Sequence, residues 1–482
     1  MSKNSKLKNF MHIGIGTIFN ILLGLITTPV ITRLVDTNDY GQLSMFNTYA
    51  SMAVMVLCLG LDQALIRFYY EYSSNDYHKY IVKITGGLSL KISVVLCILS
   101  YFFISKIFVS FDFKGIELVA LLLYSFINLF LRFALLILRV EYQTKLYAIL
   151  NALNKFIYLV IAVLMIVFVK SNNNLPFLIF ATIISSLIPL IIAVCKKLSL
   201  WNFIGVCNIS TNTNISRKDI LKYGLPFIMS MGITTIFEAL DKLTLNYFCD
   251  YSEVGIYSSA VTVVNIFTII QTTFNTVWAP MSMEHLSSNP NDTYFFKRVN
   301  SIISFLMFGF GFTLITFKDI FVLLLGEKYR MASAIVPFLI LHPIMYTISE
   351  TTVIGIDYKK KSYLHVISAT LACITNAVGN FYLVPIMGGQ GAAISTGISY
   401  IVFWGARTFF GLKNYNYKPD IYKIVILIII TLAYAFYCSI TQFNIITLLI
   451  YFIVIIVLAV LYKSVIIDLK TLIQNKIQRR QK

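Results

Sequence analysis

Charged side chains inside long apolar stretches are the residues of this sequence that could do chemistry. In the first half, Lys91, Arg132 and Lys155 interrupt apolar runs, and Asp62 is the acid that opposes them there. Charged groups in an apolar environment are costly, so they usually face a protein interior or a water-filled cavity and mark the path of a ligand or ion. The cationic excess of this half predicts that it binds an anion.

The second half carries acids instead. Its apolar runs contain Glu238, Asp241 and Glu350 against the base Lys242. Glu238 and Lys242 stand four residues apart, in the order that favours an ion pair on one helix face. Asp241 has no such local partner, and a carboxylate in a low dielectric takes up a proton, binds a cation or accepts hydrogen bonds from neighbouring helices. Cation binding or a structural carboxylate are therefore both open for Asp241.

Uncharged polar residues recur at helical spacing in the same runs. They supply hydrogen bonds to a polar ligand, or they serve close helix packing, since small and polar side chains suit both purposes. The stripes are His12, Gly16, Asn20, Gly24 and Thr27; Asn128, Arg132 and Arg139; Asn151, Lys155 and Tyr158; and Asn265, Thr268, Thr272 and Asn275.

These residues belong to a chain of 482 residues that is 58% hydrophobic and 12% charged. Soluble domains contain about 25% charged residues and disordered chains are more polar still, which excludes both classes. A helix needs about 20 apolar residues to cross the hydrocarbon, and about fourteen such runs are predicted. They lie near 10–31, 45–66, 84–109, 115–138, 147–169, 175–195, 222–248, 254–277, 299–325, 333–356, 362–384, 390–411, 421–440 and 443–462.

Basic residues set the predicted orientation. With the N-terminus inside, the inner segments carry roughly four times as many Lys and Arg as the outer loops, as cytoplasmic loops do. Both termini are therefore predicted to be cytoplasmic. The net charge of +18 is explained by attraction to anionic lipid, so no nucleic acid partner is expected.

The sequence argues against an enzyme. The longest predicted connection, 196–221, is too short for a soluble catalytic domain. Gly14-Ile-Gly16 lacks the third glycine of a dinucleotide site, and Gly388-Gly-Gln-Gly391 lacks the following Lys of a phosphate loop. The seven cysteines form no C-x-x-C pair, so neither a zinc site nor a disulfide framework is predicted.

One short motif occurs twice. Asp36-Thr-Asn-Asp39-Tyr-Gly41 and Asp250-Tyr-Ser-Glu253-Val-Gly255 both read D-x-x-[DE]-x-G and both lie between two apolar runs. An even number of predicted spans separates them, so the two repeats have the same orientation and a pseudo-axis along the membrane normal. Repeats that meet at a central site are a common transporter architecture.

The sequence resembles the bacterial polysaccharide flippases over nearly the whole chain. The resemblance is carried by Thr28-Pro29-Val-Ile-Thr-Arg33-Leu, Asp39-Tyr-Gly41, Gly60-Leu-Asp62-Gln-Ala-Leu-Ile-Arg67-Phe-Tyr-Tyr-Glu71, Tyr223-Gly-Leu-Pro226, Asn376, Asn380, Pro385, Gly388 and Gly391-Ala-Ala-Ile-Ser-Thr396. It implies the superfamily that also contains lipid II flippases and multidrug and toxin extrusion exporters. The implied fold is all-α, with two six-helix lobes forming a V-shaped cavity and two further C-terminal helices.

This resemblance implies a division of the chain into five parts. They are a first six-helix lobe over 1–195, a cytoplasmic linker over 196–221, a second six-helix lobe over 222–411, helices 13 and 14 over 412–462, and a basic cytoplasmic tail over 463–482. The tail is predicted to form an interfacial amphipathic helix or to fray.

The implied function is to move an undecaprenyl-diphosphate-linked oligosaccharide across the bacterial cytoplasmic membrane by alternating access, for surface polysaccharide biosynthesis. Expected partners are membrane lipids, glycosyltransferases and a polysaccharide polymerase. A diphosphate in a low dielectric needs cations to offset its desolvation, and Arg suits bidentate phosphate contact. The residues expected in the substrate cavity are Arg33, Arg67, Lys91, Arg132, Lys155, Asn20, Asn128 and Asn151.

The resemblance also implies cation coupling in the second lobe. Lipid II flippases of this superfamily bind Na⁺ through oxygen ligands that resemble Asn376, Asn380 and Thr396 here, together with an acid, Asp241 or Glu238. Asn380 stands where those relatives have Asp, which leaves Na⁺ or H⁺ open as the coupling ion. No other cofactor is expected. A lipid II flippase and a cation-coupled multidrug exporter of the same fold are the alternatives, although an exporter would not need a cationic first lobe.

Overall fold

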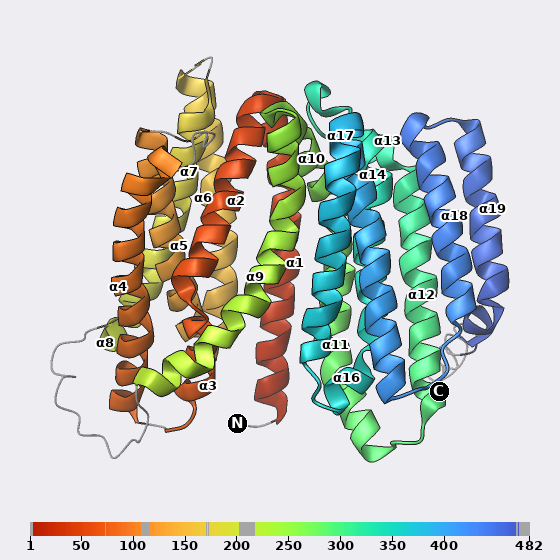
Figure 1. The fold of residues 1–482 in the computed structure, drawn as a ribbon, viewed down its shortest axis with the longest axis horizontal. Coiled ribbons are helices and arrows are strands. Elements are labelled where there is room, and N and C mark those ends of the chain that lie inside the picture. The colour runs from red at the N-terminus through yellow and green to blue at the C-terminus, as the bar shows by residue number, and fades with distance from the viewer. Residues whose placement is uncertain are drawn as a thin grey trace, which may run out of the picture. The chain divides into compact units, whose positions relative to one another are not determined.

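The protein is built from α-helices, as predicted (Figure 1). The computed structural model describes residues 3–72, 74–107, 113, 115–169, 171, 173–201, 217–468 and 471. Within these residues, nine helices are long and apolar enough to cross a membrane, or eleven if each of two bent pairs forms one span. The chain divides into two compact units, Met1–Ala239 and Leu240–Lys482.

The first unit contains helices α1 to α8 and most of α9. Helix α6 packs against α1 and α7, and α5 packs against α2 and α7. The bounds are α1 Lys3–Leu34, α2 Thr37–Cys58, α3 Leu61–Tyr69, α4 Asn75–Ile107, α5 Ile116–Val140, α6 Thr144–Val169, α7 Leu175–Lys196, α8 Leu198–Trp201 and α9 Arg217–Phe248.

The second unit begins within α9. Helix α15 packs against α12 and α17, and α14 packs against α10, α17 and α18. The bounds are α10 Tyr251–Val264, α11 Ile266–Ser288, α12 Thr293–Thr316, α13 Lys318–Leu323, η2 Glu327–Tyr329, α14 Ala332–Leu339, α15 Leu341–Thr352, α16 Ile354–Tyr358, α17 Tyr363–Asn414, α18 Ile421–Ile440 and α19 Ile445–Leu461.

Two of the predicted spans are bent. The run 45–66 consists of α2 and α3, which meet at 52°, and the run 254–277 lies in α10 and α11, which meet at 47°. Leu59 and Gly60 make the first bend with φ angles of 51° and 67°. The apolar pattern continues through both bends, so hydropathy alone gave each run as a single helix.

Helix α17 contains two predicted spans, 362–384 and 390–411. Gly388, with φ 53° and ψ −131°, interrupts the helical geometry between its two halves. Beyond this break the halves lie side by side, because a Cβ added to Gly379 would stand 2.6 Å from the Ser395 hydroxyl of the other half. A left-handed φ favours glycine, so Gly388 lets the chain turn within a few residues.

The repeated motif makes the same contact in both units. In the first unit, Asp39 accepts a hydrogen bond of 2.9 Å from the backbone N–H of Asn174, directly before α7. In the second unit, Glu253 accepts one of 3.0 Å from the backbone N–H of Gly389, where the second half of α17 begins. Both carboxylates satisfy a free N–H at a helix start, where negative charge is favoured. The repeat seen in the sequence is therefore also a repeat of structure.

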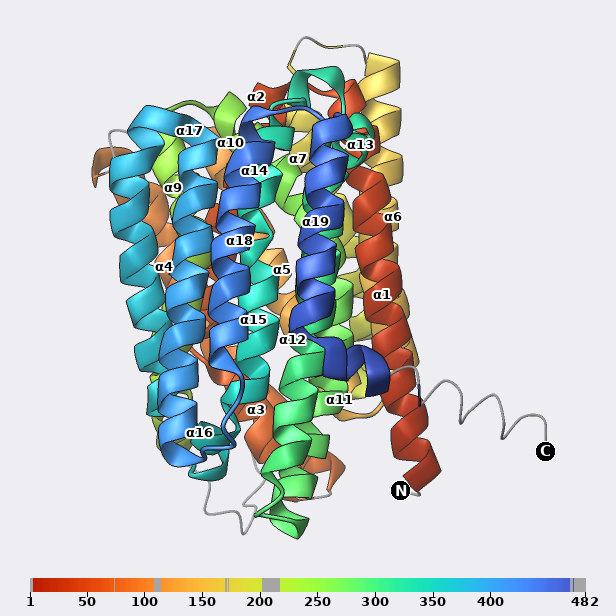
Figure 2. The same cartoon turned by 90° about the vertical axis from the view of Figure 1, so that its right-hand side faces the viewer.

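The two C-terminal helices, α18 and α19, belong to the second unit, and Figure 2 shows them side by side. Helix α19 packs on α12, and α18 on α12 and α14. Residues 463–468 continue as helix, and Asp468 forms an ion pair of 3.1 Å with Arg298 of α12. Most of the predicted linker, 202–216, and most of the predicted tail lie outside the described residues. The five-part division of the chain stays a prediction.

We predict that Gly388→Ala lowers the unfolding temperature of the purified protein in detergent. The substitution strains a left-handed backbone position, which costs about 1–3 kcal/mol, and its Cβ would lie 3.0 Å from a carboxylate oxygen of Glu253. The matched control is Gly405→Ala, a helical position with open space around it. Equal unfolding temperatures for the two variants would contradict this account of the turn in α17.

Candidate functional site

The carboxylate of Asp241 lies at the centre of a polar cluster in the second unit. Asp241 is on α9 and is 7% exposed. Its Oδ1 accepts hydrogen bonds from the Nδ2 atoms of Asn376 at 3.0 Å and Asn380 at 2.8 Å. Its Oδ2 accepts hydrogen bonds from the hydroxyl of Thr396 at 2.5 Å and from that of Tyr257. Four donors thus compensate the buried negative charge, as a buried carboxylate requires.

Three helices position this cluster. Asn376 and Asn380 are four residues apart and therefore project from one face of the first half of α17. Thr396 comes from the second half, so the turn at Gly388 is what brings its hydroxyl to the same carboxylate, and it also accepts a hydrogen bond of 3.1 Å from Asn376. Tyr257 reaches Asp241 from α10. The sequence-predicted group of Asp241, Asn376, Asn380 and Thr396 is therefore brought together.

One oxygen of the cluster has no hydrogen-bond partner among the described residues. Asn380 Oδ1 is buried and unpaired, while its Nδ2 also donates to Asn376 Oδ1 at 3.2 Å. A buried carbonyl oxygen without a partner costs free energy, so it is a position where a donor or a cation would be stabilised. Carboxylate, amide and hydroxyl oxygens are the ligands that hard cations prefer. The residues fit either Na⁺ or a proton shared with Asp241.

The acid nearest in sequence, Glu238, differs from Asp241 in its surroundings. Glu238 is exposed on α9, whereas Asp241 is buried. The sequence left the choice between these two acids open. Their burial favours Asp241 as the member of the oxygen cluster.

In the first unit Arg132 forms an ion pair with Asp62. Its Nε and one terminal nitrogen donate to Oδ2 of Asp62 at 3.1 Å and 2.5 Å. The side chain of Asp62 is 3% exposed and that of Arg132 is 40% exposed. The sequence predicts Asp62 as the acid opposing the cations of this half. The contact brings together α3, which begins after the bend at Leu59 and Gly60, and α5.

Lys155 lies on α6 and contacts α1. Its Nζ donates a hydrogen bond of 3.1 Å to the backbone oxygen of Asn20, and a Cβ on Gly24 would stand 3.1 Å from that nitrogen. Gly24 therefore leaves the space that the ammonium occupies. The end of α5 is connected to the start of α6. Measured along each helix from this connection, Arg132 lies about 12 Å and Lys155 about 16 Å away. The two cations thus have similar depths in the unit.

A match to a known family covers more than half of the chain. The sequence profile of the family described as "Polysaccharide biosynthesis protein" matches residues 6–285. The chain belongs to this family. The matched range includes Asp62, Arg132, Lys155 and Asp241.

Solved structures share the fold of this family member. It is similar to a lipid II flippase, MurJ, in an inward-closed conformation, with a TM-score of 0.70 and 16% identity over 94% of this chain and 99% of that one. It is also similar to an inward-facing multidrug resistance MATE family transporter of the MOP superfamily, with a TM-score of 0.56 and 16% identity over 86% of this chain and 98% of that one. No curated protein matches the sequence. The expected superfamily fold is confirmed, and these proteins are a flippase and a transporter rather than enzymes.

The remaining predicted cavity residues make other contacts or are exposed. Arg67 forms an i, i+4 ion pair of 3.1 Å with Glu71. Arg33, at the end of α1, and Lys91, on α4, are exposed. The amides of Asn128 and Asn151 donate to backbone oxygens one turn earlier in their own helices, at 3.0 Å and 2.8 Å. Whether any of them meets substrate stays a prediction.

The second unit holds a buried ion pair that changes the charge balance expected from the sequence. Glu350 on α15 pairs with Arg407 on α17 at 2.7 Å, and Arg407 also donates to the Ser349 hydroxyl at 2.7 Å. The guanidinium lies 4.9 Å from the centre of the Phe403 ring. Setting the acids of this half against Lys242 alone was wrong, because Arg407 is a second base inside the unit and pairs with Glu350.

Tyr257 is the member of the Asp241 cluster that sequence reasoning missed. A comparison of the two repeats could have found it, because Tyr257 follows Gly255 of the second motif by two residues and Leu43 follows Gly41 of the first. A hydroxyl at a position that is aliphatic in the other repeat is a signal of different polar chemistry in the two units.

We predict that Arg132→Ala destabilises the protein by about 1–3 kcal/mol, because it leaves Asp62 buried without its ion-pair partner. The double variant Arg132→Ala with Asp62→Ala should be more stable than the single variant, which chemical or thermal unfolding in detergent measures. The matched control is Arg67→Ala, which breaks an exposed pair worth less than about 1 kcal/mol. Strictly additive effects of Arg132→Ala and Asp62→Ala would show that the pair contributes no coupling.

Proposed function

We propose that the protein is a flippase that moves undecaprenyl-diphosphate-linked oligosaccharide units across the cytoplasmic membrane by alternating access, coupled to a cation. Its membership of a polysaccharide biosynthesis family supports the substrate class. The observation that carries the proposal is Arg132, a guanidinium inside a membrane-spanning helix that is fixed by a buried acid and yet 40% exposed. A cation that served structure alone would be buried with its partner.

The geometry of Arg132 leaves donors for an anion. A guanidinium has five N–H donors, and Asp62 accepts from Nε and one terminal nitrogen. The remaining N–H groups can bind a diphosphate bidentately, and the ion pair with Asp62 orients them before substrate arrives. Lys155 lies at a similar depth and has two further N–H donors besides the one bound to Asn20. Together they would offset the cost of moving phosphate into a low dielectric.

The cluster around Asp241 is suited to cation coupling. When bound, Na⁺ or a proton would neutralise the carboxylate. Asn376 and Asn380 now direct their Nδ2 atoms at Asp241. Na⁺ binding requires both amides to turn their oxygens inward, and a proton on Asp241 could be donated to the unpaired Asn380 Oδ1 once the Asn380 amide turns. Either event rearranges contacts between α9 and both halves of α17. A cation that binds one conformation more tightly than the other biases alternating access.

Two alternatives keep the same fold. The similarity in fold to the lipid II flippase MurJ, which covers 94% of this chain, favours a lipid II flippase. A cation-coupled multidrug exporter is favoured by the similarity to MATE family transporters. Flipping of a non-peptidoglycan prenyl-diphosphate oligosaccharide supports the proposal. Flipping of lipid II alone, or export of cationic drugs, favours one of the alternatives.

We also propose that the protein resides in the bacterial cytoplasmic membrane with both termini in the cytoplasm. The charge distribution along the sequence supports this orientation. The prenyl-diphosphate substrate is assembled by glycosyltransferases on the cytoplasmic side and consumed by a polysaccharide polymerase on the other, so both are proposed partners.

We predict that Asp241→Asn abolishes the response of transport to an imposed Na⁺ or H⁺ gradient. The measurement is the rate at which a lipid-linked oligosaccharide becomes accessible to an impermeant enzyme in proteoliposomes. Glu238→Gln is the matched control, since it removes an exposed carboxylate from the same helix. If both variants respond to the gradients as the wild type does, Asp241 does not couple a cation.

We predict that a cysteine at Lys359 is protected from membrane-impermeant thiol reagents in intact cells, in a background without the native cysteines. Lys359 lies in the connection between α16 and α17, which is proposed to be cytoplasmic. A cysteine at Gln442, between α18 and α19, should react readily. The reverse labelling pattern would overturn the orientation.

A further inference from the structure

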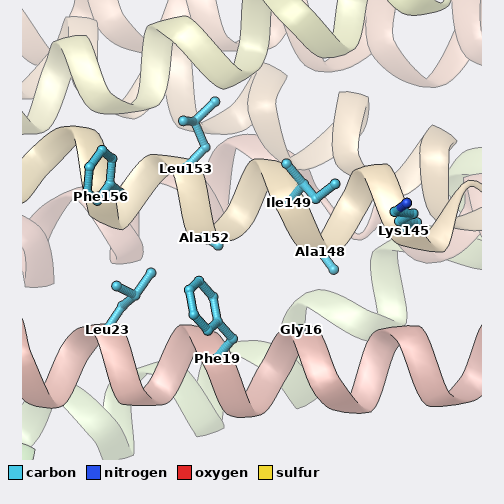
Figure 3. A pocket seen from close by; sticks show the side chains of 9 residues that line it. All are labelled: Gly16, Phe19, Leu23, Lys145, Ala148, Ile149, Ala152, Leu153 and Phe156. Atoms are coloured by element: carbon cyan, nitrogen blue, oxygen red, sulfur yellow. The ribbon is translucent and has the colours of Figure 1, made fainter.

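An apolar groove runs between α1 and α6 in the first unit. Its volume is about 520 Å³. Figure 3 shows Phe19 and Leu23 rising from α1 toward α6, where Ala148 and Ala152 point back toward α1. The sequence predicts no ligand for this helix pair other than the one expected at Asn20 and Lys155.

Small residues form the floor of the groove and large ones its walls. Gly16 packs so closely on α6 that an added Cβ would lie 2.3 Å from the Cβ of Ala148. The wall residues Phe19 and Phe156 are 54% and 53% exposed although they are aromatic. Apolar walls with an open face suit a hydrocarbon chain, which gains contact on both sides without any polar group to satisfy.

One end of the groove is basic. Lys145, the second residue of α6, is exposed and lines that end. Phe156 lines the other end, about 16 Å further along the helix, which is about half of the hydrocarbon thickness. The groove therefore offers an ammonium group near the membrane surface and an apolar track below it.

We propose that this groove binds the prenyl chain of a prenyl-diphosphate lipid, with the diphosphate at Lys145. The substrate class rests on the proposed function. The groove is a single apolar track with a single cation at its end, which matches an amphiphile with one hydrocarbon chain. A diacyl phospholipid would place one chain in the groove and leave the second without a track. A diphosphate bound at Lys145 would lie ten residues along α6 from Lys155. Lys155 contacts α1 beside the same groove.

The proposal is tested by labelling of the full-length protein in nanodiscs with a photoreactive prenyl diphosphate that carries no sugar. The label is expected in the α6 peptide that contains residues 145–156. Ala152→Phe fills the groove and should reduce labelling at least fivefold, and Lys145→Gln should reduce it without altering the packing of α1 on α6. Leu164→Phe, which places the same aromatic ring at an exposed site of α6 beyond the groove, should leave labelling unchanged.

Three results would overturn the proposal. They are unchanged labelling of Lys145→Gln and of a folded Ala152→Phe, label at another helix, or equal labelling of the same peptide by a photoreactive diacyl phosphatidylglycerol. Flipping assays separate this proposal from the proposed function. If Ala152→Phe flips lipid-linked oligosaccharide at the wild-type rate, the groove takes no part in transport, and the proposed flippase function is unaffected. If the wild type binds the prenyl probe in the groove and flips no oligosaccharide, the proposed flippase function is wrong, and the proposal that the groove binds a prenyl chain is supported.

Discussion

The cost of a charged group in hydrocarbon determines much of this structure. Three charged groups inside the spans are compensated by nearby groups: Arg132 by Asp62, Arg407 by Glu350, and Asp241 by four hydrogen-bond donors. These contacts join helices that are distant in the sequence, so they also fix which helix faces meet. Where compensation is incomplete, at the exposed side of Arg132 and at the unpaired oxygen of Asn380, the structure offers positions for a ligand.

The two units share a scaffold and differ in their polar chemistry. Asp39 and Glu253 make equivalent contacts with the start of a later helix, which indicates that the repeated motif has a structural role. The cores have diverged, since the first unit presents Arg132 and Lys155 and the second surrounds Asp241 with amides and hydroxyls. In the proposed function, one copy of this scaffold binds the anionic substrate and the other binds the cation, which would couple substrate movement to an ion.

Much of the fold could be predicted from the sequence, because hydropathy reports directly on burial in a membrane. The spans, the repeat and the break at Gly388 followed from apolar runs and glycine-rich connections. The bends at Gly60 and Asn265 did not, since the apolar pattern passes through them unchanged. Ion-pair partners that are distant in the sequence could not be predicted either. Arg407 lies near the end of a predicted span, and its pairing with Glu350 depends on tertiary packing that hydropathy does not encode.

The candidate site was predicted unevenly. Asp241, Asn376, Asn380 and Thr396 came from a family resemblance and lie together in the structure. The spacing of Asn376 and Asn380 alone placed them on one helix face, but it did not identify the acid that they contact. Tyr257 was missed because a single tyrosine in an apolar helix is usually a packing residue. Asp62 was identified as the acid of the first half, but its contact with Arg132 required the bend at Leu59 and Gly60.

The central claim is that Arg132 binds the diphosphate of a lipid-linked substrate inside the first unit. The most direct measurement is an experimental structure of the protein in nanodiscs with a prenyl-diphosphate oligosaccharide. The account predicts phosphate density within hydrogen-bonding distance of the Arg132 guanidinium, with the ion pair to Asp62 intact. A well-ordered diphosphate bound away from both Arg132 and the groove at Lys145, with Arg132 contacting protein groups alone, would contradict it.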